Sequence, residues 1–303
     1  MRGTHVGVRC VIAACGVVLM AGLTACGGDK SDEGKASDKT GDNGGQSVGS
    51  PLAALKLASQ RTDQQNSAKV EGTTQNGTQT AEMSGAMDWA DGMNATMTIT
   101  QKGGAIASSP IAGKPLQARY TPDAMFMNMG DEFAQQAGGG KHWIKYDYDV
   151  LAEKAGASGA FLKDQMQNNN PSRSVQLLMA SGKVKKVGSE SVKGAETTHY
   201  TGTVEVSELA KMQSTDLSQS DLDALQKQME QSGMKTETID LWIDNKNLLV
   251  KKREQAKSNN GGYDSTVFYS DYGTKVTVEE PSSSDTISFE EMAGGAGAPK
   301  PSS

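Results

Sequence analysis

Three short stretches of the chain alternate apolar and polar residues, and this alternation limits the fold more than any other feature. Apolar or small residues occupy every second position in residues 83–89, 93–99 and 125–129, while polar residues such as Glu82, Ser84 and Thr98 lie between them. Successive side chains of a β-strand point to opposite faces, so each row lies on one face of a sheet. The rows predict strands with a methionine-lined inner face and a polar outer face.

Turn residues divide the rest of the chain into similar strands. Asn76-Gly77 and Asp91-Gly92 are typical hairpin turns. We expect strands at 69–74, 78–89, 93–101, 116–120, 124–129, 142–148, 183–187, 197–206, 235–244, 248–257, 263–270 and 275–279. Helices are expected at 51–65, in two pieces between 150 and 181, and from Ser218 to Gly233. Hairpins with few helices predict an α+β fold rather than alternating β-α-β units.

The first 25 residues have the features of a secretory leader. Arg2 and Arg9 precede an apolar stretch, residues 10–22. This stretch is shorter than the roughly 20 residues that a membrane-spanning helix needs. The run Leu23-Thr24-Ala25-Cys26 follows and resembles the bacterial lipobox, in which the cysteine thiol receives diacylglycerol and the chain is cut just before it. We therefore expect residues 1–25 to be a signal peptide and Cys26 to be lipidated. A core helix with an incidental cysteine fits this charge pattern less well.

The remaining chain is expected to form a tether, one folded body and a tail. Residues 26–50, rich in Gly, Ser and Asp, carry little to bury and predict a flexible tether behind Cys26. Residues 51–291 contain the predicted strands and helices, and residues 292–303 predict a disordered tail. Two of the three cysteines, Cys10 and Cys15, would leave with the leader, so no thiol would remain for a disulfide or a zinc site.

Three further stretches resemble a known family. They are residues 187–200 (Val-Gly-Ser-Glu-Ser-Val-Lys-Gly-Ala-Glu-Thr-Thr-His-Tyr), Leu241-Trp242-Ile243-Asp244 with 248–251, and residues 269–281. Together with the lipobox they are similar to the actinobacterial LppX/LprG-type lipoproteins, which are related in fold to LolA. The resemblance implies a curved antiparallel β half-barrel with helices covering its concave face. It also implies an acylated lipid as ligand and a role in moving lipids across the envelope.

The methionine rows mark the expected ligand cavity. Methionine is unbranched and adapts its shape, which suits flexible alkyl chains. The candidate residues, called the methionine face below, are Met83, Met87, Trp89, Met93, Met97, Met125, Met127 and Met129. Two alternatives stay open: the rows are ordinary hydrophobic core under covering helices, or Met125, Met127 and Met129 hold Cu(I). The copper site is disfavoured because no His or Cys lies nearby.

Catalysis finds little support in the sequence. Gly-x-Ser-x-Gly, His-Glu-x-x-His and Cys-x-x-Cys patterns do not occur, and His142 and His199 fit structural or surface roles better than catalytic ones. The formal net charge of −6 disfavours nucleic acid as a partner. We expect no enzyme activity, cofactor or metal. The expected function is an extracytoplasmic, membrane-anchored carrier of an acylated lipid or other hydrophobic ligand. The alternative is a structural, sensor or partner-binding envelope lipoprotein without a cavity.

Overall fold

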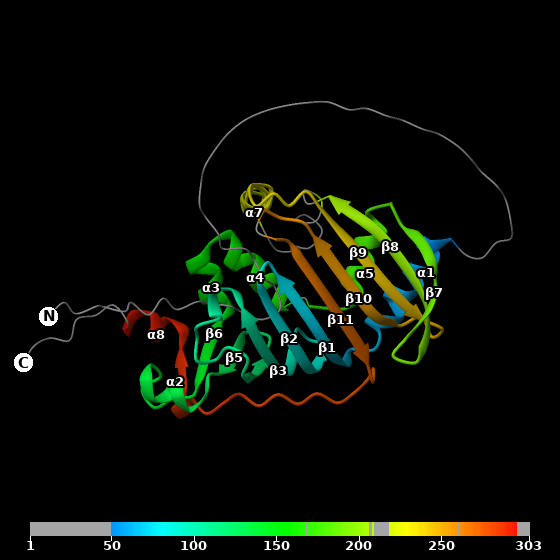
Figure 1. Cartoon of the computed structure of the whole chain (residues 1–303). Helices are drawn as coiled ribbons and strands as arrows, with labels where there is room; N and C mark the ends of the chain where they lie inside the picture. Colours follow the sequence, from blue (N-terminus) through cyan, green and yellow to red (C-terminus); the bar gives the residue numbers. More distant parts are fainter. Residues whose placement is uncertain (1–49, 168, 206–207, 209–217, 260, 296–303) are drawn as a thin grey trace, which may run out of the picture.

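The computed structural model describes residues 50–167, 169–205, 208, 218–259 and 261–295 (Figure 1). The predicted signal peptide, Cys26 and the tether up to residue 49 lie outside the described residues, as do residues 296–303 of the predicted tail. The α-helices are α1 (Pro51–Asp63), α2 (Gly130–Gln136), α3 (Tyr148–Ala155), α4 (Ala157–Gln167), α5 (Ser172–Ala180), α7 (Gln219–Gln231) and α8 (Phe289–Gly295). The strands are β1 (Ser67–Asn76), β2 (Gln79–Asp88), β3 (Asn94–Gly103), β4 (Pro115–Tyr120), β5 (Ala124–Asn128), β6 (Trp143–Asp147), β7 (Lys185–Val192), β8 (Ala195–Glu205), β9 (Thr236–Asp244), β10 (Leu249–Ala256), β11 (Tyr263–Ser270) and β12 (Thr286–Ser288).

Twelve strands of the described chain form one sheet in the order β12-β6-β5-β4-β3-β2-β1-β11-β10-β9-β8-β7. Neighbouring strands are antiparallel except for β12, which runs parallel to β6. The pairing of β1 with β11 joins two halves, β1 to β6 and β7 to β11, in each of which strands consecutive in the chain are neighbours in the sheet. The sheet therefore continues without a break from the first half of the chain to the second.

The first hairpin shows how turn chemistry sets the register. Asn76 pairs with Gln79, so Gly77 and Thr78 form the two-residue connection. Gly77 has a φ of 54°, a left-handed conformation that glycine adopts without steric cost. The turn thus begins one residue later than the Asn76-Gly77 dipeptide predicted.

Helices α1, α3, α4 and α5 lie against one face of the curved sheet, called the inner face here (Figure 1). Helix α1 begins at Pro51, and the hydroxyl of Ser50 caps it by accepting a hydrogen bond from the backbone N–H of Ala53 at 3.3 Å. Leu55 and Ala58 on this helix are fully buried beneath it. The α+β half-barrel with helices over its concave face is confirmed.

The segment after β11 differs from the prediction. Residues 275–279 were expected to form a strand, and this prediction is wrong because the segment is extended without ladder partners. Strand β11 already has β1 on one side and β10 on the other, so no free edge remains beside it. The chain instead crosses outside the sheet, where the guanidinium of Arg119 donates to the carbonyl of Glu279 at 2.6 Å.

The chain then returns to the β6 end of the sheet, where β12 pairs with β6. There Lys141 donates from its ammonium group to the carbonyl of Thr286 at 2.9 Å, and Asp285 contacts His142. Helix α8 follows and continues through Gly295, into the stretch where a disordered tail was expected. Met292 on this helix is partly buried and packs against the main hydrophobic core.

Candidate functional site

The eight residues of the methionine face belong to one hydrophobic cluster. Met83 and Met87 lie on β2, Met97 on β3, and Met125 and Met127 on β5. The connection between β2 and β3 contributes Trp89 and Met93, and Met129 directly follows β5. The structure therefore brings together all the residues that the alternation selected. Six of them are buried, whereas Met83 and Met129 are partly exposed.

Strand register places the methionines side by side on the inner face. Gly85 lies opposite Met97, which in turn lies opposite Ala118, and Ala118 lies opposite Met127. A Cβ atom at Gly85 would collide with the backbone carbonyl of Thr96 and would lie 2.8 Å from the sulfur of Met97. Small residues between the methionines thus leave the space into which the long thioether side chains extend.

One side chain from the helical region contacts the methionine face directly. The amide of Asn169, in the connection after α4, lies 3.6 Å from the sulfur of Met93. Buried helical residues also belong to the same large cluster, namely Leu55 of α1, Met166 of α4 and Leu178 of α5. Helix α1 contacts β10, and α5 contacts β8 and β9, so both lie over the second half of the sheet. A ligand on the methionine face would have to displace the Asn169 side chain or share the face with it.

Two polar atoms in this cluster are buried and have no hydrogen-bond partner among the described residues. They are the indole N–H of Trp89 and the hydroxyl of Tyr148. Burial raises the pKa of the Tyr148 hydroxyl, and the nearby charge of Asp123 adds to this effect. The phenol therefore stays protonated and remains a hydrogen-bond donor.

A polar cluster that the sequence analysis missed lies on the same inner face, in the second half of the sheet. It consists of Lys252 and Glu254 on β10, Glu237 on β9 and Ser174 on α5, and we call it the buried polar cluster. The ammonium of Lys252 lies 3.2 Å from both carboxylate oxygens of Glu254. The hydroxyl of Ser174 donates to Glu254 at 2.8 Å and accepts from Lys252 at 3.1 Å.

The sequence around β10 explains why this cluster was missed. Residues 251–254 read Lys-Lys-Arg-Glu, with charge at every position, so no alternation tells which side chains face inward. The register settles it, because Lys252 lies opposite the fully buried Leu241, and Glu254 opposite the fully buried Ile239.

The two histidines hold structural contacts, as expected. His199 stacks on the ring of Trp242 at 4.2 Å between ring centres, and its Nε2 lies 2.8 Å from Asp240. His142 lies between Asp131 and Asp285. Within the described ranges, no group of three or more His, Cys, Asp or Glu side chains is placed to hold a metal ion. No helix among those the structure describes is long and apolar enough to span a bilayer.

Comparisons with known proteins give close sequence relatives and more distant structural ones. A Streptomyces griseus protein, described as an "Uncharacterized 31.2 kDa protein in rplA-rplJ intergenic region", is 49% identical over 251 residues, covering 81% of each chain. A Streptomyces coelicolor protein named "Putative lipoprotein SCO4650" is 34% identical over 300 residues, covering 94% of this chain and 95% of the relative. No protein-family model matches the chain.

Two solved structures are of the lipoprotein type that the sequence resembles. The lipoprotein LppX of Mycobacterium tuberculosis aligns with a TM-score of 0.47 and 16% identity, covering 75% of this chain and 97% of LppX. LprF of Mycobacterium bovis aligns with a TM-score of 0.47 and 17% identity, covering 76% of this chain and 96% of LprF.

Proposed function

The chain belongs to the family of these two Streptomyces proteins, and from this premise we propose that it is a membrane-anchored lipoprotein that binds an acylated lipid or another hydrophobic ligand. The anchor in this proposal is a diacylglyceryl group on Cys26, and the body lies on the extracytoplasmic side of the cell membrane. The ligand lies on the methionine face, and the protein carries it within the envelope without catalysis.

The observation that carries this proposal is the convergence of seven adaptable methionine side chains and Trp89 in one hydrophobic cluster. Methionine changes rotamer easily. The methionine side chains can therefore pack against neighbouring side chains when no ligand is bound and change rotamer to accommodate an alkyl chain. Burying a chain of about sixteen carbons contributes on the order of 12 kcal/mol, at about 0.8 kcal/mol per methylene. That gain is large enough to offset the cost of moving the covering side chains.

The two buried donors support an acylated ligand in particular. The indole N–H of Trp89 and the hydroxyl of Tyr148 lie in the same cluster as the methionines. A buried donor without a partner costs about 1–3 kcal/mol, and the carbonyl oxygen of an acyl ester is an acceptor that an apolar chain brings with it. An acyl ester therefore supplies an alkyl chain for the apolar side chains and a carbonyl oxygen for the two buried donors.

The second candidate function is a structural or partner-binding envelope lipoprotein. The contact of the Asn169 amide with the sulfur of Met93 favours it, because a side chain of the protein already lies against the methionine face. In that case the methionines are ordinary core, and the protein acts through its outer surface with an envelope partner.

Native mass spectrometry of the full chain, purified from membranes in a non-denaturing detergent, separates the two functions. The carrier is expected to retain one non-covalent, acyl-containing lipid in addition to the covalent groups on Cys26. A well-folded wild-type protein that holds no such lipid under any mild extraction contradicts the carrier and supports the structural alternative.

A matched pair of variants tests the location of the ligand. Met83 is partly exposed, so the carboxylate of Met83→Asp can reach water and the fold is expected to survive, whereas a charge beside alkyl chains weakens lipid retention. Its neighbour Ser84 points to the outer face and is exposed, so Ser84→Asp is the control and is expected to retain lipid as the wild type does. Equal lipid retention by the two variants contradicts the assignment of the methionine face.

A further inference from the structure

The buried polar cluster lies among apolar residues on the inner face. Glu237 and Glu254 are 6% and 8% exposed, and the side chain of Lys252 is 18% exposed. Their neighbours Val204, Ile239 and Leu241 are fully buried. A buried ion pair adds little net stability, and well-packed apolar residues in its place are often neutral or stabilising. Folding therefore does not explain why three ionisable side chains lie here.

The charges of the cluster nearly cancel. Burial lowers the pKa of Lys252, but the adjacent carboxylate of Glu254 raises it above its ordinary value, so the ammonium stays charged. Burial raises the pKa of Glu237 to about 8, with the charge of Glu254 adding to the effect and that of Lys252 opposing it. Near neutral pH the cluster thus holds one cation, one anion and a mostly protonated carboxyl group, a set that contains both hydrogen-bond donors and acceptors.

A continuous row of cross-strand neighbours connects this cluster to the methionine face. Lys252 lies opposite Val267, Val267 opposite Gly72, and Gly72 opposite Met83. A Cβ atom at Gly72 would lie 3.1 Å from the carbonyl of Thr266 and 3.3 Å from Met83. The absence of a side chain at Gly72 therefore leaves room for the side chain of Met83. The row therefore has the charged Lys252 at one end and the apolar Met83 at the other, both on the inner face.

A second polar row runs beside the first. Glu254 lies opposite Ser265, and Ser265 lies opposite Thr74. The hydroxyls of Ser265 and Thr74 are buried and hydrogen-bond to one another at 3.0 Å. The polar strip of the inner face thus extends across β10, β11 and β1, as far as the strand next to the methionines.

We propose that the buried polar cluster of Lys252, Glu254, Glu237 and Ser174 binds the uncharged, hydroxyl-bearing head of the same amphipathic ligand whose alkyl part lies on the methionine face. This inference rests on the proposed carrier function. A hydroxyl group can donate to the carboxylate of Glu254 and accept from the ammonium of Lys252. An anionic phosphate head would satisfy Lys252 but would meet the carboxylate of Glu254, so the cluster selects against it.

The test compares two lipids with identical acyl chains on the full chain stripped of bound lipid. Dipalmitoylglycerol carries a free hydroxyl head, and dipalmitoyl phosphatidic acid carries an anionic one. At pH 7 the wild-type protein is expected to prefer dipalmitoylglycerol by about tenfold or more, the range that one hydrogen bond to a charged group supplies. Both affinities are measured by native mass spectrometry in the same detergent.

The double variant Lys252→Met/Glu254→Gln removes both charges together, so it leaves no unpaired buried ion. It is expected to bind dipalmitoylglycerol and phosphatidic acid with affinities within about threefold of each other. Lys252→Gln/Glu254→Gln also removes both charges while it keeps hydrogen-bonding groups at the two positions, and the same loss of preference is expected. It is the second variant should the first double variant fail to fold.

The outcomes separate the two proposals. A wild-type protein that binds neither lipid overturns the carrier function and this inference with it. Wild-type binding without preference, a preference for phosphatidic acid, or an unchanged preference in a folded double variant overturns the head-group assignment alone and leaves the carrier function standing.

Discussion

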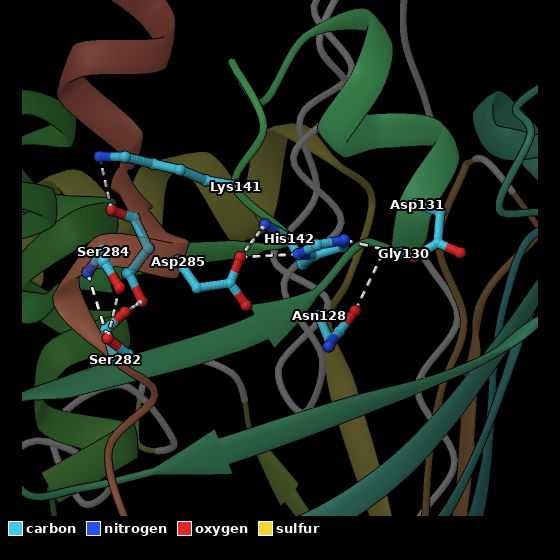
Figure 2. Close-up of polar contacts among 9 residues, drawn as sticks. Asn128, Gly130, Asp131, Lys141, His142, Ser282, Ser284 and Asp285 are labelled. Carbon is cyan, nitrogen blue, oxygen red and sulfur yellow. Dashed lines mark hydrogen bonds and ion pairs between the residues drawn. The ribbon is translucent and has the colours of Figure 1, made fainter.

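The Nδ1 atom of His142 lies 2.6 Å from a carboxylate oxygen of Asp285, and the backbone N–H of His142 donates to the same oxygen at 2.9 Å (Figure 2). These contacts join the residue before β6 to the short turn before β12, two segments 143 residues apart. On its other side, Nε2 of His142 lies 3.3 Å from Asp131. The last strand of the described chain is therefore fastened to the sheet edge by a titratable group.

The attachment of β12 is expected to weaken as the pH rises above neutrality. The hydrogen bond to Asp285 raises the pKa of His142 above its ordinary value of 6.5, so its contribution is complete below that value and is lost as the pH rises through the raised pKa. The backbone and side-chain hydrogen bonds from His142 lower the pKa of Asp285 below 3.8, so its contribution is lost only in stronger acid. Attachment is therefore strongest between about pH 4 and 6.5.

Amide hydrogen exchange of β12, corrected for the intrinsic pH dependence, measures this effect. Protection in the wild type is expected to fall as the pH rises above about 6.5, and His142→Gln is expected to show low protection with little change over the same range. An equally steep pH dependence in the variant would assign the effect to another group.

Replacement of Cys26 by serine is expected to abolish membrane attachment. The hydroxyl cannot form the thioether to diacylglycerol, so the protein is either left unprocessed or released from the membrane. Membrane fractionation and intact-mass measurement check both results, with Cys15→Ser as the control because that residue lies within the predicted leader. Normal maturation and unchanged fractionation of Cys26→Ser would remove the basis for the anchor.

Truncation of Met127 is expected to lower the free energy of unfolding by about 2–5 kcal/mol in lipid-free protein. This side chain is 5% exposed and lies in the main hydrophobic cluster, so Met127→Ala leaves a cavity. Chemical denaturation measures the change. Under the carrier proposal, added lipid raises the stability of the wild type through mass action, and Met127→Ala is expected to gain less.

Removal of the Tyr272 hydroxyl is expected to destabilise the body by about 1 kcal/mol. This hydroxyl donates to the backbone carbonyl of Leu249 at 2.6 Å, and the ring makes an edge contact with Trp89 at 6.3 Å between ring centres. Tyr272→Phe keeps the ring contact and loses only the hydrogen bond, while Tyr272→Leu loses both. Equal stability of the wild type and Tyr272→Phe would show that water replaces the lost bond.

Local sequence patterns were sufficient for the parts of the fold that depend on neighbouring residues. The period-two rows placed Met87, Met97 and Met127 on one face, and turn residues such as Gly77 located the hairpins to within one residue. These features depend on strand pleating and on φ, which are properties of a few consecutive residues. The signal for a lipidated Cys26 is likewise local, and it lies outside the described residues.

Tertiary structure alone decided what depends on strand order. The pairing of β1 with β11 left no edge for residues 275–279, so the chain passes outside the sheet there, and only residues 286–288 pair with β6 as the parallel strand β12. The same order turned Lys252 and Glu254 inward beside Leu241 and Ile239, although every residue from 251 to 254 is charged. Sequence by itself determined which residues can share a face, whereas the register between distant strands determined which face is buried, because burial depends on neighbours far apart in the chain.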